Sequence, residues 1–224
     1  MEVRLISYSK PTLPFINEGG IASDNMQDLV AYCARVSNPA NQMNTETSEK
    51  LIKYLIKNAH WSPLEMVNAC LEIKTTRDIA HQIVRHRSFA FQEFSQRYAV
   101  SEEFEHRDAR LQDEKNRQNS IETEDNRLIE KWNMEQSKVI NEAKKVYKWA
   151  LDNGIAKEQA RAVLPEGNTM STIYMAGTLR SWIHYCQLRM AHGTQKEHMD
   201  IAKKCWSIIG THFPDVVKAV ESET

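Results

Sequence analysis

The stretch Val67-Asn68-Ala69-Cys70-Leu71-Glu72-Ile73-Lys74 places apolar side chains at every second position. This period of two predicts a strand with one buried face. Directly after it, Ile79 and Ile83 are four residues apart, which predicts a helix from about 76 to 84 or 85 with one apolar side. A half-buried strand followed at once by a helix indicates a fold in which helices pack on a small sheet.

The rest of the chain indicates short strands early and long helices late. Residues 3–8 have the pattern of a strand, which Pro11 and Pro14 end, and Pro63 predicts a turn at 60–63. We expect helices at 24–35, 48–58, 128–154, 158–163, 170–190 and 196–212. The predicted fold class is α+β, a single domain over residues 1–224 whose small, mostly antiparallel or mixed sheet is packed with long helices.

Residues 101–130 differ from the rest of the chain in composition, because charged side chains are frequent there and apolar ones are few. A stretch of this kind cannot bury much surface. We therefore expect a polar excursion from the domain, in the form of a charged loop or a solvated linker.

The charge balance limits the class of protein. The chain has 224 residues, with 29 Lys plus Arg against 30 Asp plus Glu and a formal net charge of −1, which argues against a protein that coats nucleic acid. No apolar run is long enough for a membrane span, and early charges such as Arg4 and Lys10 argue against a secretory signal. The cysteines form no CxxC pair and the histidines no metal-ligand spacing, so we expect a cytoplasmic protein with no membrane partner and no metal.

An unusual stretch follows the helix predicted for about 76 to 84 or 85. The run Arg85-His86-Arg87-Ser88-Phe89-Ala90-Phe91-Gln92-Glu93-Phe94-Ser95-Gln96-Arg97-Tyr98 combines three arginines with aromatic and amide groups. Guanidinium groups bind phosphate with two parallel hydrogen bonds, and an amide such as that of Gln82 can read the edge of a base. Two alternatives remain open here, a basic helix end with ordinary surface salt bridges and a module that binds RNA or DNA.

A second group of cations lies near the C-terminal end. Arg180 and His184 are four residues apart and share a helix face, whereas Arg189 lies about half a turn away at roughly 100° per residue. This spacing is typical of a helix between two anionic ligands, or of a surface helix whose arginines stack on neighbours. Arg161, just before Pro165, is a further cation.

These residues together resemble one family. Arg85-His86-Arg87, seven further residues and Ser95 match the RHR-x7-S signature of the flavin-dependent thymidylate synthases. Four more segments are similar to that family in the same order along the chain: Ala34-Arg35-Val36-Ser37, His60-Trp61-Ser62-Pro63-Leu64-Glu65, Arg161-Ala162-Val163-Leu164-Pro165 and Leu179-Arg180 with His184 and Leu188-Arg189. The resemblance covers most of the chain outside about 101–130 and the last dozen residues.

The resemblance implies a homotetramer that holds FAD in active sites between subunits. Such an enzyme converts dUMP to dTMP, with methylenetetrahydrofolate as the one-carbon donor and NADPH as the reductant. It needs no cysteine nucleophile, because the reduced flavin supplies hydride. A flavoprotein with a different substrate is the remaining alternative within the same cofactor class, and the choice between NADPH and NADH stays open.

The resemblance also implies residue roles. The FAD contacts would be Ser62, Arg85, His86, Arg87, Glu93, Thr178, Leu179, Arg180 and His184. The dUMP contacts would be Gln82, Ile83, Val84, Arg85, Glu93, Phe94, Ser95, Gln96, Arg97, Arg161 and Arg189. Arg189 would be catalytic, because its charge stabilises the uracil as N3 ionises and C5 becomes more nucleophilic. Ser95 would bind dUMP rather than attack it, because no base is evident beside it.

The family often has Asn-Ala-Arg where this chain has Thr178-Leu179-Arg180. The arginines themselves are unevenly placed, since residues 75–114 and 158–195 contain nine of the 13 arginines and none of the 16 lysines. Arginine in preference to lysine suits fixed-charge, bidentate binding of phosphate.

Overall fold

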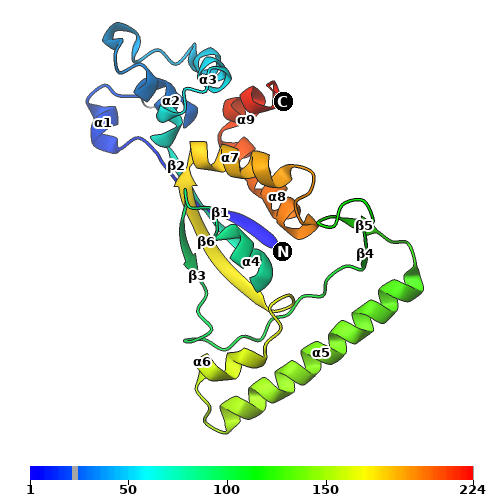
Figure 1. The fold of residues 1–224 in the computed structure, drawn as a ribbon. Coiled ribbons are helices and arrows are strands. Elements are labelled where there is room, and N and C mark those ends of the chain that lie inside the picture. The colour runs from blue at the N-terminus through cyan, green and yellow to red at the C-terminus, as the bar shows by residue number, and fades with distance from the viewer. Residues whose placement is uncertain (22–24, 224) are drawn as a thin grey trace.

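The computed structural model describes residues 1–21 and 25–223, and its centre is a four-stranded antiparallel sheet (Figure 1). The strand order is β1-β2-β6-β3. The strands span Glu2–Tyr8 (β1), Asn68–Thr76 (β2), Ala90–Glu93 (β3) and Met170–Thr178 (β6). The long pairing of β2 with β6 runs from Asn68 opposite Thr178 to Thr76 opposite Met170. The predicted α+β class with a small antiparallel sheet is confirmed.

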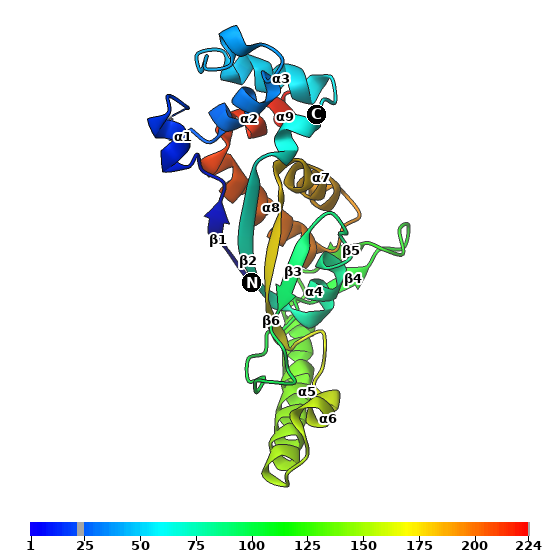
Figure 2. The same cartoon turned by 90° about the vertical axis from the view of Figure 1, so that its left-hand side faces the viewer.

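Helices cover one face of this sheet and leave the other open (Figure 2). The covering helices are α4 (Arg77–Ile83), α7 (Leu179–Met190) and α8 (Lys196–His212). Alternate residues of the central strands, among them Leu71 and Ile173, face these helices and are fully buried. The period of two in the sequence therefore sets which side of the sheet receives the core.

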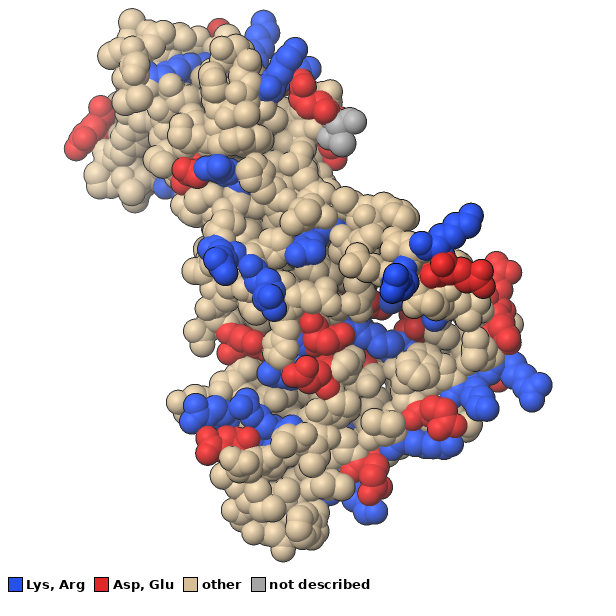
Figure 3. Space-filling view, in the orientation of Figure 1, with Lys and Arg blue, Asp and Glu red and all other residues tan. Residues whose placement is uncertain are grey.

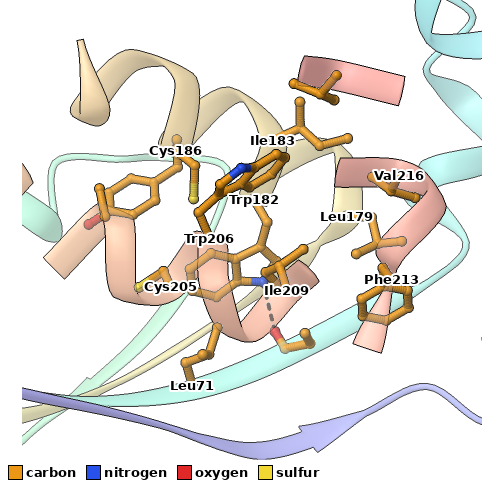
Figure 4. Packing of buried hydrophobic residues seen from close by; sticks show 14 of the residues in the cluster. Leu71, Leu179, Trp182, Ile183, Cys186, Cys205, Trp206, Ile209, Phe213 and Val216 are labelled. Atoms are coloured by element: carbon orange, nitrogen blue, oxygen red, sulfur yellow. Dashed lines mark hydrogen bonds between the residues drawn. The ribbon is translucent and has the colours of Figure 1, made fainter. Parts of the chain in front are cut away.

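The core between sheet and helices is rich in aromatic and sulfur-containing side chains. Figure 4 shows Trp182 and Cys186 of α7 packed against Cys205 and Trp206 of α8. The indole Nε1 of Trp182 donates to the carbonyl of Ala69 on β2 at 3.1 Å. This bond satisfies the polar end of a buried indole and fixes α7 to the sheet.

A group of helices lies at one end of the sheet (Figure 1). It consists of α1 (Leu13–Asn17), α2 (Gln27–Ala34), α3 (Ser48–Lys57) and α9 (Pro214–Glu221), with the 3-10 turns η1 (Pro39–Asn41) and η2 (Ser62–Glu65). The predicted helix at 48–58 is confirmed as α3, and the predicted turn at 60–63 leads into η2. The helix predicted at 24–35 corresponds to α2, although its predicted start at Asp24 lies outside the described residues. The helices α1 and α9 were not predicted.

The long helix α5 (Asn126–Asp152) lies at the opposite end, next to α6 (Lys157–Ala160) and the 3-10 turn η3 (Arg161–Val163). Asp125 caps α5, because its side chain accepts a hydrogen bond from the backbone of Leu128. Several large apolar side chains of α5 remain exposed, including Val139 and Trp149. A single copy of the chain therefore leaves part of this helix uncovered.

The prediction of one helix over 170–190 is wrong in its first half. Residues Met170–Thr178 form strand β6, and the helix begins only at Leu179. The burial of this segment alternates, with Ser171, Ile173 and Met175 inside, and pairing with β2 and β3 completes the sheet. Tertiary pairing thus decides a segment whose isolated sequence also suits a helix.

The segment 101–130, for which we expect a polar excursion, is mostly exposed, but it also holds regular structure that we did not predict. The segment contains a hairpin of β4 (Arg110–Gln112) and β5 (Ser120–Glu122). Arg107 contacts Asp78 of α4 at 2.5 Å, and Arg110 contacts Glu197 of α8 at 2.6 Å. Ion pairs and backbone hydrogen bonds, such as that from the N–H of Met170 to the carbonyl of Glu103, join this arm to the domain, and apolar content alone does not indicate them.

Charges of both signs are interspersed on the face seen in Figure 3, without a broad patch of one sign. Within residues 1–21 and 25–223, no helix combines the length and the apolar character that crossing a bilayer requires.

Candidate active site

The signature Arg85-His86-Arg87 occupies the turn between α4 and β3. The helix α4 ends at Ile83, with Val84 as its C-cap residue. The backbone N–H of His86 donates to the carbonyl of Ile83 in the turn that follows. The side chains of Arg85 and Arg87 are exposed and contact no carboxylate among the described residues. The turn therefore presents two guanidinium groups whose charge no carboxylate of residues 1–21 or 25–223 neutralises.

His86 turns inward and contacts α7. The Nε of Arg189 donates to Nε2 of His86 at 2.9 Å, and the ring of Tyr185 lies edge-on at 4.9 Å between centroids. Because a guanidinium can only donate, Nε2 of His86 accepts and its proton sits on Nδ1. Burial, followed by the charge of Arg189, lowers the pKa of His86 to about 4, so the ring is neutral at pH 7.

The opposite face of α7 carries a second group of predicted residues. Arg180 forms an ion pair with Glu65 of η2 at 2.5 Å, and the His184 ring lies edge-on to Trp61 at 4.8 Å. Burial and the neighbouring Arg180 lower the pKa of His184. Ser62 lies in the same turn η2 and is exposed. The two cationic faces that the sequence predicts for this helix are therefore present.

Thr178 caps the N-terminus of α7, where its hydroxyl accepts from the backbone of Ser181 at 3.2 Å. The hydroxyl of Ser181 in turn donates to the carbonyl of Ser88 at 3.2 Å, which joins the signature turn to α7. Leu179 beside the cap is fully buried in the core, as is Ile83 at the end of α4, so neither of these two predicted site residues presents an exposed atom to a ligand in this structure.

A third group lies around the end of β3. Glu93 accepts from Arg77 at 3.2 Å and from the hydroxyl of Ser171 at 2.8 Å. Beyond it, Arg97 pairs with Glu158 at 3.2 Å, and the Nε of Arg161 donates to the carbonyl of the same glutamate at 3.3 Å. The segment after β3 and the turn η3 are thereby held close together.

A cavity of about 1010 Å³ lies on the open face of the sheet, and Glu93, Phe94 and Ser95 line part of it. Gln96 instead points inward, where it is 3% exposed and donates to Ser101. The lining does not include Arg85, Arg161 or Arg189. In one chain, the predicted site residues therefore form three neighbouring groups rather than one closed pocket.

Sequence reasoning missed several residues that support these groups. His198 and Gln195 contact Gln82 across the interface of α4 and α8, and Tyr185 packs against both His86 and His198. Gln195 and His198 lie more than a hundred positions from Gln82 in the chain. No local spacing in a single sequence indicates such pairings.

The two inner histidines predict a dependence of stability on pH. Burial, with Arg189 and His86 as smaller causes, lowers the pKa of His198 to about 3, while an unfolded histidine has a value near 6.5. The unfolded chain therefore binds more protons, and the free energy of unfolding should fall as the pH is lowered from about 6.5 toward 4. Urea unfolding at several pH values measures this dependence. In His198→Gln the free energy of unfolding should change less steeply with pH over this range than in the parent chain. The exposed His192→Gln is the control, and an equal change of slope in both variants would contradict the assignment.

Comparison with known proteins shows the family to which the chain belongs. The family model described as thymidylate synthase complementing protein matches residues 21–215. A probable flavin-dependent thymidylate synthase of Paramecium bursaria Chlorella virus 1 is 48% identical over 222 residues, which cover 99% of each chain. The flavin-dependent thymidylate synthase of Synechocystis sp. is 48% identical over 221 residues, covering 99% of this chain and 100% of the relative.

Among solved structures, a UMP/dUMP methylase PolB from Streptomyces cacaoi bound with 5-Br dUMP superposes with a TM-score of 0.82 at 24% identity. The match covers 99% of this chain and 94% of that one, and it shows that the fold is shared. The match of the family model to most of the chain, together with the near-complete match to relatives of the same length, places the chain in the family of flavin-dependent thymidylate synthases.

Proposed function

We propose that this protein converts dUMP to dTMP, with FAD as cofactor, methylenetetrahydrofolate as one-carbon donor and NADPH as reductant. The observation that carries the proposal is the 48% identity, over nearly the whole length, with relatives named flavin-dependent thymidylate synthase. The resemblance proposes which residues of this chain would bind each group, and the geometry described above supports several of these roles.

The chemistry of the donor set fits FAD. Arg85 and Arg87 supply two guanidinium groups without a carboxylate partner in the described chain, which suits a pyrophosphate. On the next face, Arg180 and His184 with Ser62 offer polar contacts beside the Trp61 ring. The hydroxyl of Thr178 is engaged in the helix cap. In this proposal the flavin is therefore bound by the other residues named for FAD and not by this hydroxyl. When bound, FAD supplies hydride and carries the one-carbon unit.

For dUMP, the supporting residues are the segment Glu93–Arg97, Gln82 with Val84 beside it, and the cations Arg161 and Arg189. The Ser95 hydroxyl accepts from the backbone N–H of Arg97 at 3.4 Å and contacts no histidine or carboxylate in the described chain. A serine without a base is a poor nucleophile. Ser95 therefore binds substrate in this proposal.

The cysteines also support a route without thiolate attack. Cys186 and Cys205 are fully buried, and burial raises the pKa of Cys186 well above its ordinary value and that of Cys205 to about 12. Burial raises the pKa of Cys33 and Cys70 as well. Because the thiolate is the nucleophile, none of the four is prepared to add to C6 of uracil.

Arg189 is the residue proposed to act on the substrate. Its Nε is held by His86, and the guanidinium keeps further N–H groups for a ligand. A fixed positive charge stabilises the uracil anion that forms when N3 loses its proton, and that anion is the stronger carbon nucleophile at C5.

We infer a homotetramer as the working form. The three groups of predicted site residues do not close one pocket within a single chain, so a second copy would complete it. The exposed apolar side chains of α5, among them Met134, Val139 and Trp149, are a surface that a second copy would cover.

The test is release of tritium from dUMP labelled at C5, measured with flavin-loaded protein. Release should require methylenetetrahydrofolate and either NADPH or NADH, tested side by side. Flavin absorbance of the purified protein excludes a nucleic-acid module at the same time. A flavin-loaded protein that gives no release would contradict the proposal and favour a flavoprotein with a different substrate.

A further inference from the structure

A buried glutamate and a buried histidine lie at the two ends of a hydrogen-bonded chain behind the signature turn. Glu197 is 4% exposed and His198 is 0% exposed, although they are adjacent in α8. The side-chain amides of Gln195 and Gln82 connect them, with Gln195 next to Glu197 and Gln82 next to His198. Neither Glu197 nor His198 has a part in the function proposed above, which leaves their burial to be explained.

The contacts form one continuous series. The Nε2 of Gln195 donates to Oε2 of Glu197 at 3.0 Å, and Nε2 of Gln82 donates to Oε1 of Gln195 at 2.8 Å. At the far end, Nδ1 of His198 lies 3.3 Å from Oε1 of Gln82. Each amide is therefore engaged at both its nitrogen and its oxygen.

Glu197 fixes the direction of this series. Burial by itself would raise the pKa of Glu197, but a backbone hydrogen bond and the charges of Arg107 and Arg110 outweigh it, so the pKa lies below the ordinary value. An ionised carboxylate only accepts, so Gln195 must present its NH2 group to Glu197 and its oxygen to Gln82. Without that end point, both amides could turn over together and make the same number of bonds.

The same logic sets the histidine tautomer. Oε1 of Gln82 is an acceptor, so Nδ1 of His198 carries the proton, and Nε2 is left as a bare acceptor. This Nε2 is buried and has no hydrogen-bond partner in the described part of the chain. The ring packs against Tyr185 at 5.8 Å and lies 6.3 Å from the ring of His86.

We propose that Glu197 is a positioning residue, which through Gln195 locks the amide of Gln82 in one orientation toward the substrate. The inference rests on the proposed function, in which Gln82 binds dUMP. A Gln82 amide in one orientation presents its remaining N–H and its oxygen lone pair to dUMP at defined places. An amide that turns over freely would place its N–H against a donor of dUMP in one of its two orientations. The ion pair of Glu197 with Arg110 also connects this orientation to the hairpin β4–β5.

The experiment is a double-mutant cycle on the Kd for dUMP. Glu197→Gln should weaken dUMP binding by about three- to tenfold, the worth of one neutral hydrogen bond, because the new amide accepts or donates equally well. In a Gln82→Ala background the same change should have no further effect. A loss of full size in that background would show that Glu197 only supports the fold, and would overturn the proposal.

Two further variants keep the test decisive. Gln195→Met breaks the series while leaving the ion pairs of Glu197 intact, so it should raise the Kd for dUMP by the amount expected for Glu197→Gln. It therefore tests the proposal even if Glu197→Gln fails to fold. Glu122→Gln is the control, because this exposed carboxylate pairs with Lys196 in the neighbouring turn and contacts no member of the series. An unchanged Kd in Gln195→Met would also overturn the proposal.

A spectroscopic readout separates this inference from the proposed function. In protein with 15N-labelled histidine, His198 should give the nitrogen shifts of the Nδ1–H tautomer, and Glu197→Gln or Gln195→Met should shift them toward a mixture of tautomers. This holds whether or not dUMP binds. Failure of the parent chain to bind dUMP would contradict the proposed function, whereas unmoved histidine shifts would contradict the inference alone.

Discussion

Replacing Arg189 by alanine should lower the rate of thymidylate formation by a factor of at least about 10²–10³ while the flavin stays bound. Losses of this size are usual when one preorganised donor or charge at a reacting group is removed. Retention of the flavin is expected because Arg85, Arg87 and Arg180, which we propose as its cationic contacts, remain in place. Tritium release from dUMP and the flavin absorbance of the purified variant measure the two effects separately.

Arg189→Lys is the matched variant for this experiment. It keeps the positive charge but loses the Nε that donates to His86, so it should recover part of the activity. The two variants also differ in their effect on His86, because removing the charge lets the pKa of that ring move back toward its ordinary value. Colourless protein from Arg189→Ala would mean that this arginine binds the cofactor rather than acting on the substrate.

Replacing Trp182 by alanine should lower the free energy of unfolding by about 3–5 kcal/mol, which is a large part of the stability of an ordinary domain. Its indole is 0% exposed and lies edge-on to Phe89 at 4.8 Å, in the segment that follows the signature turn. The change also removes the hydrogen bond to Ala69. Urea unfolding monitored by circular dichroism measures the loss.

Tyr54→Ala is the control for loss of a large aromatic side chain, since this tyrosine of α3 is 55% exposed and lies outside the α5 surface that a second copy would cover. Its cost should stay within about 0.5 kcal/mol. Equal losses in the two variants would mean that the core between α7 and the sheet is not the main source of stability.

The elements that could be predicted from the sequence are those whose pattern is local. The alternation in 67–74 and the apolar spacing in 48–58 each report on one face of one element, and both predictions are confirmed by β2 and α3. Strand β6 could not be predicted in this way, because Met170–Thr178 is a strand only through its pairing with β2 and β3. A single sequence does not show that pairing.

The same distinction between local patterns and long-range contacts applies to the candidate site. The placement of Arg180 and Arg189 on two faces of α7 follows from helix geometry, and the structure shows it. The contact of Arg189 with His86 and the series from Glu197 to His198 depend on how α4, α7 and α8 pack, which no spacing reveals. Which of the predicted residues bind FAD or dUMP stays a prediction for the experiments above.

The pairing of β2 with β6 has a consequence for how the chain folds. The two strands are separated by roughly a hundred residues, so the cost of closing a long loop is met before the central sheet forms. During synthesis, β2 and the signature turn leave the ribosome well before the strand that completes them. The arginines at the ends of α4 and α7 therefore come together only when nearly the whole chain is available, so truncated products present no assembled site.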